Sequence, residues 1–347
     1  MFPGQFTLCL NTKDLAGMRR FYEALGMKVH IDQPQFVLLN NGDVDIALMT
    51  FLDQPCLNFR GADVFELHEQ AAAAGLVLEG TPQRYKQEQY NAHADGMNWV
   101  EYDPDGNNVF FDTNEGEMGD KGDALALQRV LDATSKQLIN VGASDACQNA
   151  FRTQVLEQFM RPERRAQTNL GLDTTPLTEP GQYVGNFNLC LKTKDNAASR
   201  TFYQALGLEV TGNNDDKWVQ VGNGDCEINL MTFLGENWLN FRGADVFKVY
   251  EQLSAAGLEL EGEPTRYTSE EMGGPASGAH WNTKDPDGNV VYFDTTDPEL
   301  IVPGESKAIE TVLTGTQRNL RNIGADEDCM AAFQTEVLDR FTGSSAS

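Results

Sequence analysis

Apolar residues near the N-terminus recur first with the period of a strand and then with that of a helix. Residues 6–11 alternate apolar and polar side chains, as a half-buried strand does. An apolar helical stripe follows, from the candidate N-cap Asp14 to the stop signal Gly26. Strands at 36–39 and 45–51 then flank an Asn-Asn-Gly-Asp turn, which is typical of a hairpin.

The next stretch repeats this order of elements. A strand at 56–60 precedes a helix at 63–74 that ends at Gly75, and strands follow at 77–79, 98–102 and 108–113. The two stretches together predict a pair of βαβββ modules.

The whole unit occurs twice along the 347 residues. Leu57–Phe65 and Leu239–Phe247 are the same nine residues, LNFRGADVF. TLCLNTKD from Thr7 corresponds to NLCLKTKD from Asn188, and DPDGNNVFFDT from Asp103 corresponds to DPDGNVVYFDT from Asp285. We therefore expect two domains, at 1–115 and 186–297, and four modules in all.

Each domain is followed by a segment with two amphipathic helical patterns. These predicted helical hairpins occupy 121–160 and 305–342, and a segment rich in Pro, Thr and Gly at 161–185 is the expected linker. The favoured interpretation packs each hairpin on its sheet or on its copy. A catalytic role of the hairpins is the less favoured alternative, and dimerisation through them is a further one.

Composition narrows the range of partners. The chain has 26 Lys and Arg against 52 Asp and Glu, a net charge of −26 that repels nucleic acid and anionic membranes. No run of about 18 apolar residues could span a bilayer, and no secretory leader pattern opens the sequence. Six cysteines lie apart in apolar segments, as reduced core thiols do. We expect a cytoplasmic protein with no nucleic-acid partner and no membrane partner.

The repeated motifs resemble the vicinal oxygen chelate superfamily, which includes glyoxalases, bleomycin-resistance proteins and extradiol dioxygenases. They are a strand followed by T-K-D, a helix ending F-Y-x-A-L-G, the strand L-N-F-R-G-A-D-V and the turn D-P-D-G-N-x-V, over residues 6–113 and 187–295. The resemblance implies an α+β fold in which tandem βαβββ modules form two cup-shaped mixed sheets, with the ligand inside each cup.

Metal-dependent members of that superfamily carry His, Gln or Glu ligands at three strand positions. The corresponding residues here are Thr7, Cys56 and Phe110 in the first domain, and Asn188, Trp238 and Tyr292 in the second. Neither set makes a recognisable metal site, so no metal and no cofactor is expected. None of the four histidines falls at a motif position; they are His30, His68, His93 and His280.

Strand alternation then suggests which side chains face the cups instead. Aromatic and polar groups predominate among the candidate ligand-binding residues: Cys56, Asn58, Arg60, Trp99, Phe110, Asp112, Trp238, Asn240, Arg242, Trp281, Tyr292 and Asp294. Two Arg–Asp pairs, Arg60 with Asp112 and Arg242 with Asp294, are expected on adjacent strands. A structural ion pair is favoured over an anion receptor. Cys9 and Cys190 face the cups without a neighbouring base, which favours small buried thiols over nucleophiles.

Three functions remain open. The favoured one is a metal-free protein that binds a small organic molecule in one or both cups. The second is a lyase, isomerase or dioxygenase with displaced ligands, in which Asp112 or Asp294 and His280 hold a metal. The third is a structural or dimerising protein with vestigial cups. Whether the protein is an enzyme is left open, because a fold locates a site without assigning its chemistry.

Overall fold

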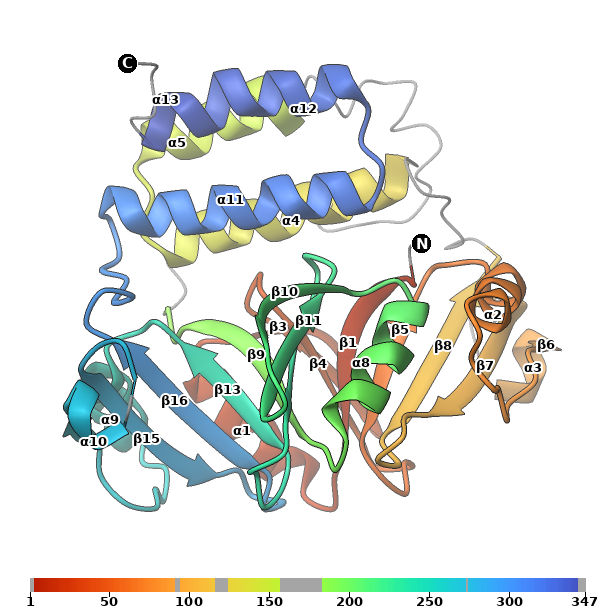
Figure 1. Cartoon of the computed structure of the whole chain (residues 1–347). Coiled ribbons are helices and arrows are strands. Elements are labelled where there is room, and N and C mark those ends of the chain that lie inside the picture. Colours follow the sequence, from red (N-terminus) through yellow and green to blue (C-terminus); the bar gives the residue numbers. More distant parts are fainter. Residues whose placement is uncertain (1–2, 91–93, 116–123, 157–182, 273, 343–347) are drawn as a thin grey trace.

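The computed structural model describes residues 3–90, 94–115, 124–156, 183–272 and 274–342. Two mixed eight-stranded sheets lie side by side, with a layer of helices from both predicted hairpins beyond them (Figure 1). The predicted α+β architecture of tandem βαβββ modules is confirmed. Among the helices in these ranges, none has the length and hydropathy needed to cross a membrane.

The first sheet is built by two modules that meet at its centre. The first module comprises β1 (Gln5–Asn11), α1 (Leu15–Ala24), β2 (Lys28–Gln33), β3 (Phe36–Asn40) and β4 (Asp45–Met49). The second comprises β5 (Cys56–Arg60), α2 (Val64–Ala73), β6 (Gln83–Tyr85), α3 (Gln87–Tyr90), β7 (Gly96–Tyr102) and β8 (Asn108–Asn114). The strand order is β2-β3-β4-β1-β5-β8-β7-β6, and the central strands β1 and β5 run antiparallel.

The second sheet repeats this order. Its first module comprises β9 (Asn186–Lys192), α8 (Asn196–Ala205), β10 (Glu209–Asn214), β11 (Trp218–Gly222) and β12 (Glu227–Met231). Its second comprises β13 (Trp238–Arg242), α9 (Val246–Ala255), β14 (Thr265–Tyr267), α10 (Ser269–Met272), β15 (Gly278–Lys284) and β16 (Val290–Thr296). The order is β10-β11-β12-β9-β13-β16-β15-β14.

Two strand expectations differ from the structure. Residues 77–79 form no strand; the short strand lies at β6, where Arg84 pairs with Met97 of β7. Val77 is 94% exposed, so its place in the apolar pattern reflects no burial. Strand β2 was missed because its sequence, KVHIDQ, is mostly exposed and pairs with β3 through a bulge.

Local sequence signals explain the helices that cover the sheets. Asp14 caps α1 by accepting from the backbone N–H of Gly17 (2.9 Å), and Asp63 caps α2 in the same way. Between the helices and the sheets lies an apolar core shared by both domains. Stacked rings mark it in each copy, such as Phe59 on Phe111 with centroids 5.6 Å apart.

The DPDGN turn of each domain is fastened to a helix of the other domain. The Tyr22 hydroxyl on α1 donates to Asp285 Oδ2 (3.0 Å), and the Tyr203 hydroxyl on α8 donates to Asp103 Oδ2 (2.8 Å). Each aspartate also accepts from the Asn four residues later, which closes its own turn. Because both carboxyl groups are only 4% exposed, each turn is locked by a polar contact that reaches across the domain interface.

The two helical hairpins pack on each other within the chain. The first comprises α4 (Ala124–Asn140), α5 (Asp145–Ala150) and η1 (Phe151–Leu156); the second comprises α11 (Ser306–Asn322), α12 (Glu327–Phe333), η2 (Gln334–Leu338) and α13 (Asp339–Thr342). Figure 1 shows α4 beside α11, and the hydroxyls of Thr134 and Thr316 meet between them (2.6 Å). The apolar stripes are buried in this contact. Residues 121–123 and 157–160 of the first predicted hairpin, and 161–182 of the predicted linker, lie outside the described residues.

Candidate functional site

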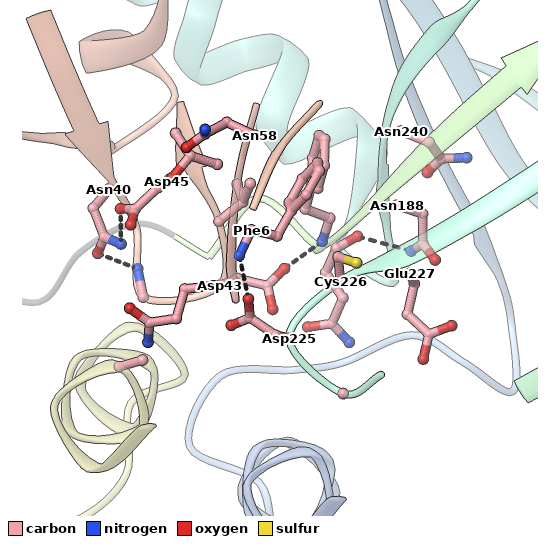
Figure 2. A pocket seen from close by; sticks show the side chains of 18 of the residues that line it. Phe6, Asn40, Asp43, Asp45, Asn58, Asn188, Asp225, Cys226, Glu227 and Asn240 are labelled. Atoms are coloured by element: carbon pink, nitrogen blue, oxygen red, sulfur yellow. Dashed lines mark hydrogen bonds between the residues drawn. The ribbon is translucent and has the colours of Figure 1, made fainter. Parts of the chain in front are cut away.

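The inner faces of the two sheets line one connected cavity of about 2090 Å³. Helices α4 and α11 contribute side chains to its wall, so the hairpins help to enclose it. Figure 2 shows the part of the cavity where the first strands of the two domains approach each other. A volume of this size accommodates an organic ligand.

Ten of the twelve candidate residues line this cavity. In the first cup they come from the parallel neighbours β5 and β8, which place Arg60 opposite Asp112. In the second cup β13 and β16 place Arg242 opposite Asp294 in the same register. The residues concerned are Cys56, Asn58, Arg60, Phe110, Asp112, Trp238, Asn240, Arg242, Tyr292 and Asp294.

The remaining two candidates, Trp99 and Trp281, lie on the opposite face of their sheets, and this part of the expectation is corrected. Trp99 stacks on Phe111 (4.6 Å between centroids), and Trp281 stacks on Phe293 (5.2 Å). Each partner is the immediate neighbour of a cavity residue, so alternation points it into the helix-covered core. Both indoles are buried there, at 0% and 2% exposure.

Each cup contains a polar cluster of one Asn, one Arg and one Asp. In the first cup Asp112 accepts from Arg60 and from Asn58 Nδ2, the latter at 2.7 Å. In the second cup Asp294 accepts from Arg242 and from Asn240 Nδ2 (3.0 Å).

Arg242 also bonds Glu299 Oε2 at 2.7 Å, so its charge is shared by two carboxylates. Burial raises the pKa of Asp294, and the Arg242 charge opposes that rise. The geometry favours the ion-pair interpretation of these residues.

The second cup has an aromatic wall. Trp238 and Tyr292 stack with centroids 4.9 Å apart and planes inclined by 24°. The ring of His280 lies beside this stack, with its centroid 5.9 Å from that of Tyr292. Trp218 lines the same cup, and its indole N–H donates to Asn229 Oδ1 (2.8 Å). Burial raises the pKa of Tyr292, so its hydroxyl stays neutral.

Among the described residues, the wall of the second cup holds a buried amide oxygen that has no hydrogen-bond partner. Asn240 Oδ1 is buried and accepts no hydrogen bond, while the Nδ2 of the same amide is used by Asp294. The side chain is only 8% exposed and lines the cavity (Figure 2). An unsatisfied buried acceptor is costly, and a donor group on a ligand would satisfy it.

The first cup carries the thiol of Cys56 at the position where the second carries the indole of Trp238. Cys9 and Cys56 are directly opposite each other on β1 and β5, and both line the cavity. A hydrogen bond from the Cys9 thiol lowers the pKa of Cys56, and the same contact together with burial raises the pKa of Cys9. Sequence reasoning placed both on the cup face but missed their pairing. That pairing depends on the antiparallel contact of β1 and β5, which brings together two residues 47 positions apart.

A pair of aspartates that the motifs did not single out lies where the domains meet. Asp43 accepts from the backbone N–H of Phe187, and Asp225 accepts from that of Phe6, so the contacts are reciprocal (Figure 2). Gln137 of α4 adds a bond to Asp43 at 2.6 Å. Burial raises the pKa of Asp43 to about 6. The sequence signal that could have identified these aspartates is the corresponding turn in the two copies, NNGD in the first and GNGD in the second.

The superfamily's metal positions carry groups that do not fit its divalent ion. Thr7, Cys56 and Phe110 line the first cup, and in the second the Trp238–Tyr292 stack fills two of the three positions. Within the described ranges, no three His, Cys, Asp or Glu side chains converge as metal ligands. His30 contacts Lys136, His68 packs on Trp99, and His93 lies outside the described residues.

Comparison with known proteins gives matches in structure alone. No family model and no curated protein sequence matches the chain. A Mn(II)-bound glyoxalase from Novosphingobium aromaticivorans matches at 12% identity and a TM-score of 0.45, covering 84% of this chain and 80% of its own. A catechol 2,3-dioxygenase matches at 12% identity and 0.46, covering 87% and 88%. The 2,3-dioxygenase LapB from Pseudomonas sp. KL28 matches at 15% and 0.46, covering 84% and 91%.

The fold is the one that the sequence resemblance predicts. Strand order and register in the two sheets give four βαβββ modules, paired as in the vicinal oxygen chelate proteins. The structural matches are likenesses of overall arrangement, and they carry no inference about a metal, a substrate or a reaction of this chain.

Proposed function

We propose that this chain is a binding protein that holds a small organic molecule with a planar aromatic part in its second cup, without a metal ion in that cup. The observation that carries the proposal is the stacked Trp238–Tyr292 pair, which stands where metal-dependent relatives place ligands. Its exposed ring surface lines a cavity large enough for such a molecule. An aromatic ligand stacking on this wall gains about 0.5–1.5 kcal/mol beyond its area burial.

Charge and hydrogen bonding suggest what else the ligand carries. Arg242 is neutralised by Asp294 and Glu299, so it is not a free receptor for an anion. The unsatisfied Asn240 Oδ1 calls for a hydrogen-bond donor. A neutral or cationic molecule with an N–H or O–H group beside its ring fits both features, and the net charge of −26 favours the same class.

A metal-dependent enzyme with displaced ligands is the second candidate function. His280 is directly opposite Asp294 on neighbouring strands, and its Nδ1 is buried with no partner among the described residues. Against it, both oxygens of Asp294 already accept hydrogen bonds from Arg242 and Asn240. A metal at this position would have to displace an ion pair.

Elemental analysis of the purified protein separates these two functions. The binding-protein proposal expects no stoichiometric Fe, Mn, Ni or Zn. One such ion per chain that is lost in His280→Ala or Asp294→Asn, with the circular dichroism spectrum unchanged, would favour the enzyme. A thermal-shift screen should then find planar heteroaromatic amines raising the melting temperature, while matched aromatic carboxylates do not.

Two further proposals concern the state of the protein in the cell. All six cysteines are free and buried, which supports a reducing, cytoplasmic location. Homodimerisation through the hairpins has less support, because their apolar faces are buried against each other within the chain. Sedimentation at several protein concentrations tests it; a monomer throughout excludes the dimer.

A further inference from the structure

The two cups differ most at one pair of corresponding positions. In the second cup Cys190 of β9 lies opposite Trp238 of β13, and its sulfur accepts a hydrogen bond from Asn229 Nδ2 at 3.8 Å. In the first cup Cys9 of β1 lies opposite Cys56 of β5, and Ala47 of β4 takes the place of the amide. The first cup therefore has two facing thiols where the second has one thiol with amide and indole neighbours.

The strand register sets the separation of the two thiols. Residues directly opposite on antiparallel strands have Cα atoms about 4.5–5.5 Å apart and side chains on the same face. The two thiols lie in one buried cluster with Ala47. Two sulfurs held in this way can bind one metal ion from both sides without a change in the backbone.

A methionine side chain packs against the two thiols. Met49, on β4, packs against the cluster of Cys9, Ala47 and Cys56, and it also lines the cavity. The apolar side chains of Phe36, Leu38, Leu52 and Phe110 pack against the same cluster. Thiolate and thioether ligands in an apolar setting select soft ions and discriminate against hard ones such as Mg²⁺ and Mn²⁺.

We propose that Cys9, Cys56 and Met49 form a binding site for a soft monovalent metal ion of the Cu(I) class in the first cup. Binding replaces two S–H bonds by two S–Cu bonds, releases two protons to solvent and leaves copper as Cu(I), so no oxidant or reductant is required. The ion enters through the cavity, whose acidic groups and the net charge of −26 attract cations.

This site is distinct from the one proposed for the organic ligand. It uses the first sheet, it binds a monovalent ion rather than the superfamily's divalent ion, and its three ligands are all sulfur. The outcome of its test leaves the proposal for the second cup unaffected, because it is read from the Cu(I) stoichiometry and from variants of the first-cup residues Cys9, Cys56 and Met49.

The test is a titration of the full chain with Cu(I) under argon, in competition with bathocuproine disulfonate. We expect the protein to withdraw one Cu(I) per chain and to release two protons in weak buffer. Cys9→Ser and Cys56→Ser should each weaken that site at least 100-fold, and Met49→Leu about tenfold. The matched control Cys190→Ser, which alters the corresponding thiol of the second cup, should leave it unchanged.

A second measurement needs no substitution at the site. Iodoacetamide labelling followed by peptide mapping should show that Cu(I) protects Cys9 and Cys56, whereas labelling of Cys190 stays the same. Failure to bind one equivalent, equal loss in Cys190→Ser, or labelling of Cys9 and Cys56 unchanged by Cu(I) would each overturn the proposal.

Discussion

In the cluster of Arg242, Asp294 and Glu299, we expect substitutions of the two members of the buried ion pair to differ in their effect on stability. Asp294 is 7% exposed and accepts from both Arg242 and Asn240, whereas Glu299 lies nearer the surface with 47% of its side chain exposed. Within the part of the chain that the structure describes, Arg242 thus has two acidic partners, whereas Asp294 has one cationic partner. Removing the Arg242 side chain should therefore lower the free energy of unfolding more than removing that of Asp294.

The magnitudes follow from what each substitution leaves behind. Breaking a buried ion pair costs about 3–5 kcal/mol. Asp294→Leu leaves Arg242 with Glu299, so we expect a loss near the lower end, about 3 kcal/mol. Arg242→Met leaves a buried carboxylate facing Glu299 with Asn240 as its remaining donor, so we expect about 5 kcal/mol. The double variant should recover to within about 2 kcal/mol of the native protein.

Urea unfolding followed by tryptophan fluorescence measures all four members of this cycle, with constant m-values as the check on comparability. The pH dependence of the free energy of unfolding gives a further prediction, whose direction follows from the pKa of Asp294. Burial already holds the pKa of Asp294 above its ordinary value, and loss of Arg242 raises it further. A raised native pKa means that the native state binds more protons than the unfolded state, so the deficit of Arg242→Met should shrink as pH falls.

Equal losses from the two single substitutions would refute the inferred charge distribution. So would a double variant whose loss equals the sum of the two. A stably folded double variant that binds its aromatic ligand normally would show that Arg242 and Asp294 stabilise the fold and do not contact the ligand. A double variant that folds well but binds far more weakly would instead make Arg242 a ligand contact.

Two other predictions concern the interface between the domains. With the pKa of Asp43 raised to about 6, its carboxyl stays protonated in the native state between about pH 4 and 6, while the same group ionises in the unfolded chain. The free energy of unfolding should therefore fall as the pH rises through that window. Asp43→Asn should remove this pH dependence, and an unchanged pH dependence in urea unfolding would contradict the assignment. Tyr22→Phe removes a hydrogen-bond donor to the buried Asp285 and should lower the free energy of unfolding by about 1.5–3 kcal/mol, and Tyr203→Phe should have the same effect. The exposed control Tyr102→Phe should leave the free energy of unfolding unchanged in the same assay.

Repetition and strand alternation made most of the fold predictable. The duplicated motifs identified the modules, and alternation with module order brought Arg60 to Asp112 and Arg242 to Asp294 on neighbouring strands. These features are local in sequence or repeated, so a single chain reveals them.

What could not be predicted depends on long-range register. Trp99 lies one residue from a cavity-facing position, and a shift of one residue reverses the face of a strand residue. The pairing of Cys9 with Cys56 requires knowing that β1 and β5 are neighbours. The packing of α4 on α11 joins segments about 180 residues apart, and amphipathic patterns indicate only that each helix needs a partner.

The measurement that tests the central claim most directly is a ligand titration of Trp238 variants. Binding of a planar heteroaromatic amine found by thermal shift would be measured by calorimetry for the native protein, Trp238→Ala and the first-cup control Phe110→Ala. If the ligand stacks on Trp238 and Tyr292, Trp238→Ala should weaken binding about tenfold or more, a loss of at least about 1.4 kcal/mol, while the first-cup variant binds normally. Unchanged affinity in a folded Trp238→Ala protein would contradict the claim that the second cup is the binding site.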